Sequence, residues 1–434
     1  MMGASTSPSD ASRSPSSPAG GPRAYKWELI LLLWGAFFLN QGDRQVFNSV
    51  IPLIRDDLGL SDVQIGLVGT VFTIIYGILV PVAGYAGDVI QKRWVVFLSL
   101  LTFSLGTLAT GFAGGFILLI VFRSIATGAG EAFYYPAANS LIGQYHRESR
   151  ARAMAIHQTA NYTGVVIGGW LAAWIGETFG WRMSFLSFGV AGIAWAALLM
   201  LRVRNDRRDA AGEHTGATPP ESVPLGEALR YMLNKPTLWL LSLAFGGMAF
   251  VHIGYVTWMP TFLYEKFEIS LSSAGFSSMF WHHLPAYFGV LTAAWVSDRW
   301  ARSRKTVRME VECVGLLCGA PFLWLMGATD TLWIAYLGLA GFGLFRGVYD
   351  SNLFAALFDV IEPKYRATAT GLMLSVAYVI AAAAPVLLGW LKQHLDLSAG
   401  ISALSFVYLG SSLLVFVALR CFFRKDYHVP KNIP

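Results

Sequence analysis

The sequence predicts an all-α membrane protein with twelve transmembrane helices in two pseudo-symmetric six-helix halves, and three observations predict it. First, 55% of the 434 residues are hydrophobic and 13% are charged, whereas an ordinary soluble domain has about 25% charged residues. Second, apolar runs long enough to cross a bilayer, which takes roughly 20 residues, recur along most of the chain. Third, sequence patterns of the first half return in the second. This composition excludes a soluble enzyme.

The first half follows a short segment rich in Ser, Pro, Gly and Ala over residues 1–24. This composition predicts a disordered tail, and the segment lacks the apolar core that a cleaved secretion signal needs. Residues 25–203 then make up the N-terminal half. Its six predicted spans cover about 27–53, 65–87, 94–112, 116–144, 152–176 and 181–203.

The second half begins after a polar linker over residues 204–236. The end of this linker, LGEALRYMLNKP, has the spacing of a short amphipathic surface helix. Residues 237–423 make up the C-terminal half, and residues 424–434 make up a short tail. The six predicted spans of this half cover about 237–261, 272–296, 308–327, 331–358, 367–391 and 400–423.

The distribution of Lys and Arg predicts the orientation, because these residues accumulate in loops that stay in the cytoplasm. With the N-terminus inside, most of the 32 basic residues are cytoplasmic, and the outer loops hold only Arg55, Arg182, Lys266 and Lys392. We therefore expect a multi-pass protein of the plasma (bacterial inner) membrane with both termini and the linker in the cytoplasm. The same asymmetry accounts for the net charge of +6, so we expect no nucleic-acid partner.

Two short patterns repeat between the halves. The loop GYAGDVIQKRW after the second span corresponds to AAWVSDRWARSRK after the eighth, and RESRARAMA corresponds to PKYRATATG further along each half. Two repeated halves around a linker are typical of a transporter that works by alternating access to a central site.

The first of these loops resembles the motif G-x-x-x-D-R-x-G-R-[KR] of the major facilitator superfamily. Val89 and Gln91 depart from the motif, and Ala294 replaces the glycine of the second copy. The resemblance covers about residues 27–425, and it implies the two-half fold and a gating role for both loops. Within the superfamily, the segments NQGDRQVFNSVIPL and RSIATGAGEAFYY are similar to two groups, the anion:cation symporters for organic acids and the spinster-like lipid transporters. The predicted gating residues are Gly84, Asp88, Lys92, Arg93, Asp298 and Arg299.

The first span carries Asp43 and Arg44. Charges within a bilayer are costly unless they are paired or hydrated, so each one is a candidate functional residue. Neighbouring residues of a helix point about 100° apart, and the two side chains need not pair with each other. One interpretation is a buried structural ion pair. The other, which the resemblance supports, is that Asp43 binds a proton and Arg44 binds an anion.

The fourth span carries Arg123 and Glu131. A carboxyl group near the middle of a membrane suits reversible proton binding, because burial disfavours its charged form. The resemblance implies an arginine separated from this glutamate by six residues, whereas seven separate them here. In a regular helix, Arg123 and Glu131 would therefore point about 80° apart.

Further polar residues lie within other spans. Arg346 and Asp350, one helical turn apart, form either a static lock or an anion site that opens during transport. The histidines of the second half lack a nearby cysteine or carboxylate to complete a metal site, so we expect no metal and no cofactor. The predicted substrate-binding residues are Arg44, Arg123, Tyr134, Tyr135, His157, Asn161, Tyr162, His252, Tyr255, His283, Tyr287, Arg346 and Asp350.

The predicted function is secondary active transport, because the sequence holds no phosphate-binding loop for ATP and no enzyme motif. We expect proton-coupled symport of a small organic anion by a monomer, with Asp43 and Glu131 as proton carriers. One alternative is a spinster-like transporter of lysolipids or other amphiphiles. Another is a non-transporting receptor on the same scaffold, which would usually need a larger soluble domain than this chain offers.

Overall fold

The computed structural model describes residues 22–146, 149–203, 225–301 and 303–428. The side chains of a few helical residues, among them Gly84 and Asp88, lie outside this description. The described residues form helices joined by short turns, without a strand. The all-α class predicted from the sequence is therefore confirmed.

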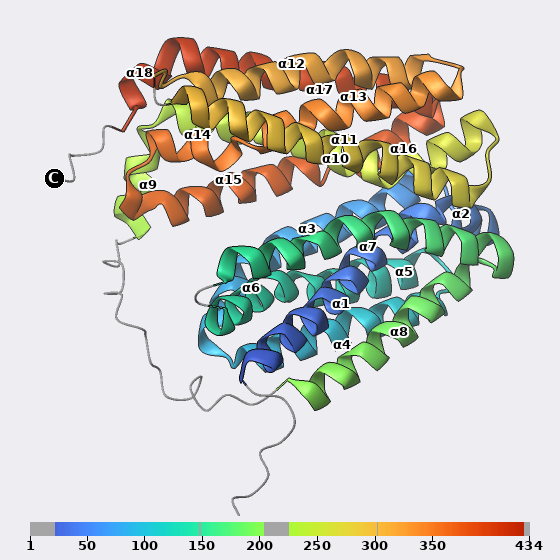
Figure 1. The fold of residues 1–434 in the computed structure, drawn as a ribbon. Helices are drawn as coiled ribbons and strands as arrows, with labels where there is room; N and C mark the ends of the chain where they lie inside the picture. Colours follow the sequence, from blue (N-terminus) through green and yellow to red (C-terminus); the bar gives the residue numbers. More distant parts are fainter. Residues whose placement is uncertain (1–21, 147–148, 204–224, 302, 429–434) are drawn as a thin grey trace, which may run out of the picture.

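The N-terminal half contains six membrane-length segments (Figure 1). The first predicted span ends at Ser49 rather than near residue 53, because a separate short helix begins at Ile51 with Pro52 in its first turn. The fourth span is composite, since a π-helical segment interrupts its α-helix. The helices of this half are α1 (Pro22–Ser49), α2 (Ile51–Leu58), α3 (Asp62–Val89), α4 (Lys92–Thr110), α5 (Phe116–Leu119), η1 (Ile120–Ala126), α6 (Thr127–Tyr145), α7 (Arg150–Phe179) and α8 (Trp181–Arg202).

The C-terminal half repeats this plan with three further interruptions. One lies directly after Asp350, one lies after Ala381, and the third is a π-helical segment after Val417. A short helix, α9, lies where the linker helix is predicted. The helices are α9 (Leu225–Leu233), α10 (Pro236–Phe267), α11 (Leu271–Ala301), α12 (Val307–Ala328), α13 (Leu332–Asp350), α14 (Leu353–Val360), η2 (Pro363–Tyr365), α15 (Arg366–Ala381), α16 (Ala384–His394), α17 (Leu397–Val417), η3 (Ala418–Phe422) and α18 (Phe423–Asp426).

Three of the twelve segments are less apolar than the rest. Among the residues that the structure describes, nine helical segments are long and apolar enough to cross a membrane. The other three predicted spans are α1, α7 and α11, which are as long but carry more polar residues. A polar residue within a bilayer faces the interior of the bundle or a water-filled cavity. These three helices are therefore the ones expected to border a polar cavity.

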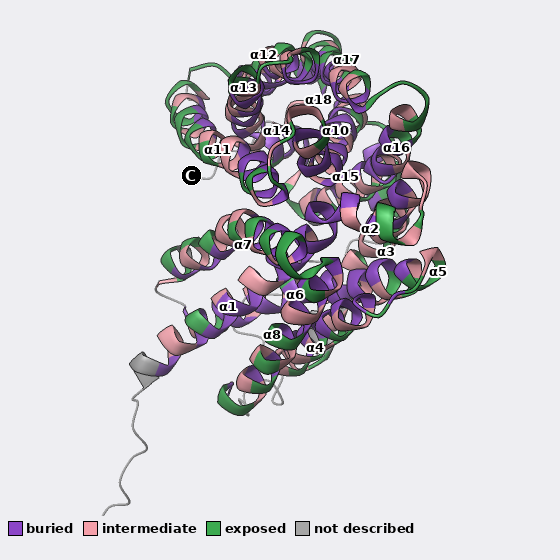
Figure 2. Cartoon of the chain, turned by 90° about the vertical axis from the view of Figure 1, so that its right-hand side faces the viewer, coloured by how far each residue is buried: buried purple, intermediate pink, exposed green. Residues whose placement is uncertain are grey.

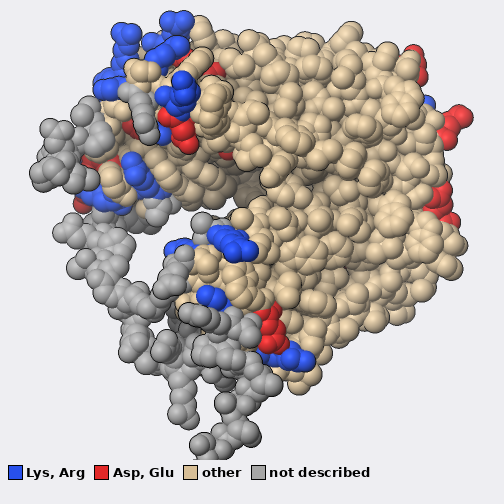
Figure 3. Space-filling model, in the orientation of Figure 1, with Lys and Arg blue, Asp and Glu red and all other residues tan. Residues whose placement is uncertain are grey.

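The two halves pack against each other at one side of the molecule (Figure 1). We call the side where α1 begins and α9 lies the linker side, and the side where α2 and the end of α16 lie the far side. Viewed from the far side, buried residues gather inside each half (Figure 2). On the linker side the surface is hollowed between the halves (Figure 3).

The far side is held closed by ion pairs between the halves. Arg55 of the N-terminal half lies 2.7 Å from Glu265, and Lys392 of the C-terminal half lies 3.0 Å from Asp62. Lys392 also contacts Glu265 at 2.8 Å, so the four side chains form one alternating cluster. We call these four residues the far-side ion cluster. It closes the central space on this side and leaves the linker side open.

Candidate functional site

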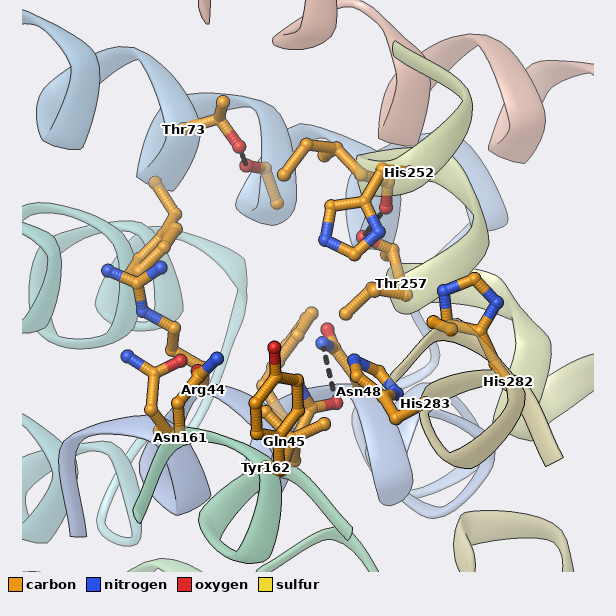
Figure 4. A pocket seen from close by; sticks show the side chains of 18 of the residues that line it. Arg44, Gln45, Asn48, Thr73, Asn161, Tyr162, His252, Thr257, His282 and His283 are labelled. Carbon is orange, nitrogen blue, oxygen red and sulfur yellow. Dashed lines mark hydrogen bonds between the residues drawn. The ribbon is translucent and has the colours of Figure 1, made fainter. Parts of the chain in front are cut away.

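A cavity of about 360 Å³ lies between the halves. It is bordered by α1, α3 and α7 from one half and by α10, α11 and α13 from the other (Figure 4). The less apolar helices α1, α7 and α11 thus all contribute to it. Its polar lining comprises Gln41, Arg44, Gln45, Asn48, Thr73, Arg123, Gln158, Asn161, Tyr162, His252, Thr257, His282, His283, Arg346 and Asp350.

Five amide side chains make up much of the N-terminal wall. On α1, Gln41, Gln45 and Asn48 recur at spacings of four and three, which places them on one helix face. On α7, Gln158 and Asn161 do the same. Each amide offers both hydrogen-bond donors and acceptors. This wall, which we call the amide wall, is suited to a ligand that carries several hydroxyl groups.

Four charged residues of the N-terminal half form a compact cluster. Arg44 Nε donates a hydrogen bond to Glu131, and Thr107 Oγ1 donates to Asp43 at 2.6 Å. Arg123 Nη1 lies 3.9 Å from the Asp43 carboxylate and 3.8 Å from that of Glu131. One oxygen of each carboxylate is buried without a hydrogen-bond donor. Asp43 and Arg44 therefore do not pair with each other, and each carboxylate keeps one oxygen that can accept a proton.

A π-helical segment explains how Arg123 reaches this cluster. The sequence places one residue more between Arg123 and Glu131 than the resemblance implies, and a regular helix would turn the two side chains apart. Arg123 lies inside η1, whose π-helical turns take up more residues than α-helical turns. The extra residue is absorbed there, and both side chains face Asp43.

In the C-terminal half, Arg346 is the centre of the polar contacts. Its Nη1 lies 2.6 Å from His252 Nδ1 and 3.1 Å from His282 Nε2. Its Nε lies 3.4 Å from the Asp350 carboxylate. Asn161, Tyr162, His252, His283, Arg346 and Asp350 thus line the cavity, as do Arg44 and Arg123.

His282 and the glutamines are absent from the predicted binding residues. Because His282 and His283 are adjacent, no periodicity indicates which of them contacts an arginine on another helix. The amide wall had a clearer signal, since the spacing of Gln41, Gln45 and Asn48 marks one face of a helix.

Five predicted binding residues do not line the cavity. His157 stacks on Phe37 with ring centroids 4.6 Å apart, and Tyr134 donates to the Leu33 carbonyl at 2.6 Å. Tyr255 is buried and donates to the carbonyl of Ser278. The stacking and hydrogen-bond partners of these three side chains lie within the same half of the protein. The side chains therefore do not have to face a polar cavity. The remaining two, Tyr135 and Tyr287, are partly exposed beside His157 and Tyr162 respectively.

The predicted gating loops lie at the linker-side ends of α3 and α11. Gly84 and Asp88 belong to the last turns of α3, and their side chains are outside the described part of the structure. Lys92 begins α4, and Arg93 donates to the Met200 carbonyl at 2.6 Å, which ties α4 to α8. Asp298 and Arg299 are exposed near the end of α11.

Comparisons with known proteins agree with this fold. The family model described as the Major Facilitator Superfamily matches residues 33–385. A hexuronate transporter of Bacillus subtilis is 25% identical over 407 residues, which are 91% of this chain and 93% of the relative. Human protein spinster homolog 1 is 27% identical over 85% of this chain and 73% of its own.

A solved structure also resembles this one closely. A bacterial homolog of the human lysosomal transporter Spinster, in an inward-facing and unoccupied conformation, superposes with a TM-score of 0.83. It shares 23% identity, and the match covers 94% of this chain and all of the other. With the family match over most of its length, this chain is a multi-pass membrane transporter that belongs to the major facilitator superfamily.

Proposed function

We propose that the protein carries a small organic anion across the membrane together with protons, by alternating access. The observation that carries this proposal is the balance of charge around the cavity. Three arginines, Arg44, Arg123 and Arg346, are matched there by the three carboxylates Asp43, Glu131 and Asp350. An anion that enters adds a charge that is costly to bury. A proton on Asp43 or Glu131 offsets that charge.

The N-terminal cluster supports a specific order of events. Arg44 Nε donates to Glu131, so the charge of Arg44 is largely offset while that carboxylate is charged. A proton on Glu131 weakens this ion pair and releases the Arg44 guanidinium toward the cavity. In the same way, a proton on Asp43 would weaken its ion pair with Arg123, whose Nη1 lies 3.9 Å from the Asp43 carboxylate. Arg44 and Arg346 then bind the anionic group from opposite walls.

The amide wall favours a hydroxylated acid, such as a sugar acid. An anion with several hydroxyl groups would place its carboxylate at the arginines and its hydroxyls along Gln41, Gln45 and Asn48. The similarity to a hexuronate transporter supports the same class. A cavity of about 360 Å³ is at the small end for ligand sites, which suits a compact molecule.

A second candidate is a spinster-like transporter of lysolipids, which the superposition on a Spinster homolog supports. The polar lining of the cavity is the opposing observation, because an acyl chain binds by burying apolar surface. The two candidates therefore differ in what the ligand must offer to the protein, namely hydroxyl groups or methylene groups.

Thermal stabilisation by ligands tests this proposal. We expect D-glucuronate and D-gluconate to raise the unfolding temperature, because a ligand at 100 times its Kd stabilises the folded state by about 2.7 kcal/mol. D-glucose, which lacks the carboxylate, is the matched control and should have little effect. Stabilisation by lysophosphatidylcholine alone would instead establish the second candidate.

We further propose that the linker side faces the cytoplasm of a plasma membrane and that the protein acts as a monomer, since one chain supplies both walls of the cavity. Single cysteines replacing Glu268 and Ser303, which are exposed on the far side and the linker side, test the orientation. In a background without the native cysteines, a membrane-impermeant maleimide should label Glu268→Cys in intact cells and Ser303→Cys only after permeabilisation. The opposite pattern would contradict this orientation.

A further inference from the structure

The contacts of Arg346 fix the protonation of two histidines. Arginine is always a hydrogen-bond donor in proteins, so His252 Nδ1 and His282 Nε2 both act as acceptors toward its Nη1. Neither nitrogen carries a proton in this arrangement. A neutral imidazole must then hold its single proton on the other ring nitrogen, which is Nε2 in His252 and Nδ1 in His282.

Because of this geometry, His252 cannot both accept a hydrogen bond from Arg346 and carry a second proton. A second proton must enter at Nδ1, because Nε2 already carries one. The lone pair of Nδ1, however, accepts the hydrogen bond from the N–H of Arg346. Protonation of His252 therefore displaces Arg346 from the ring, and the displaced guanidinium is free to bind another acceptor.

His252 is better placed than His282 to take up a proton from the cavity. His282 is fully buried between the rings of Tyr255 and Phe342, at centroid distances of 4.7 Å and 4.8 Å. His252 is only partly buried and borders the cavity (Figure 4). Of the two histidines in contact with Arg346, His252 is therefore the more accessible from the cavity.

The groups that face His252 oppose a positive charge until an anion arrives. They are Arg346 of α13, His282 and His283 of α11, and Arg44 of α1. The carboxylate of Asp350, which also lines the cavity, is already paired with Arg346. An anion beside Arg346 would supply the missing negative charge.

We propose that His252 is a second proton-binding site, in the C-terminal half, which is loaded only when an anion occupies the cavity beside Arg346. The inference rests on the proposed function for the presence of that anion. The proton comes from water in the cavity and binds at Nδ1, and the N–H of Arg346 turns from His252 to the anion. One more proton then moves with each anion than the N-terminal cluster alone would carry.

Transport by purified protein in liposomes tests this site, with D-glucuronate as the probe. The number of protons per anion follows from the membrane potential that balances a known substrate gradient at a fixed pH gradient. We expect His252→Gln, which keeps an acceptor for Arg346 but does not titrate, to carry one proton fewer than the wild type. His394→Gln, which replaces an exposed histidine outside the cavity, should match the wild type. An unchanged ratio in His252→Gln, or a loss of one proton only in Asp350→Asn, would overturn the inference.

A second measurement does not depend on transport. Nitrogen-15 NMR of histidine-labelled protein without substrate should show His252 protonated at Nε2 and His282 protonated at Nδ1, with the two signals assigned from the variants His252→Gln and His282→Gln. A proton on Nδ1 of His252 in this state would contradict the contact on which the site depends. If the wild type does not transport D-glucuronate, the proposed function fails for this acid, and the spectra still decide the histidine assignment.

Discussion

Replacing Asp43 by Asn and Glu131 by Gln should abolish the part of proton-driven substrate accumulation that the N-terminal cluster provides. Each amide keeps the shape of a protonated carboxyl group but does not titrate. In the wild type, accumulation rises about tenfold per pH unit for each proton carried, because each pH unit is about 1.4 kcal/mol of driving force. In the double variant we expect accumulation to fall by this factor for each proton that the two carboxylates carry, so that only the proton on His252 still drives uptake.

Exchange without a gradient separates this effect from simple loss of function. At least one of the single variants should still exchange labelled for unlabelled substrate, because exchange requires binding and alternating access but no net proton movement. Glu28→Gln is a matched control, since Glu28 pairs with Arg202 at the surface, away from the cavity. Full proton-driven uptake by the double variant would place the coupling elsewhere.

Replacing Arg346 by Lys should weaken anion binding by about 10- to 150-fold. The planar guanidinium can make two charge-assisted hydrogen bonds to one carboxylate, whereas a lysine offers a single point charge. Loss of one such bond costs about 1.5–3 kcal/mol, which corresponds to this range of affinities. Calorimetric titration with the acid that stabilises the wild type best measures the change.

Three comparisons decide how this result is interpreted. Arg420→Lys, at an exposed arginine outside the cavity, should bind the acid as the wild type does. If the ligand were a lipid, each added methylene would contribute about 0.8 kcal/mol, so affinity would rise with chain length. If Asp350→Asn prevents folding while Arg346→Lys binds normally, the pair is a static lock.

The sequence predicted the charged part of the site better than the neutral part. Arg44, Arg123 and Arg346 were expected at the cavity because a charge within a bilayer has few other places to lie. Neutral polar and aromatic residues are less constrained, since packing within a bundle satisfies them as well. His157 and Tyr134 show this, because both hydrogen-bond or stack inside the N-terminal half.

The spans themselves were predictable, but helix rotation and local winding were not. Apolar length located α1, α7 and α11 even though their polar residues lower their hydropathy. The π-helical winding that brings Arg123 to Glu131 has no signal in the sequence beyond one additional residue. The choice between His282 and His283 depends on how α11 is rotated against α13, where Gly343 and Gly347 let the two backbones approach closely.

The far-side ion cluster has a practical consequence for handling this protein in the laboratory. Its charges are partly exposed, and exposed ion pairs contribute only about 0–1 kcal/mol each. Dissolved salt screens them further, since the Debye length falls from about 10 Å at 0.1 M to about 3 Å at 1 M. We therefore expect the fraction of molecules with a closed far side to depend on ionic strength, so transport rates should be compared at one salt concentration.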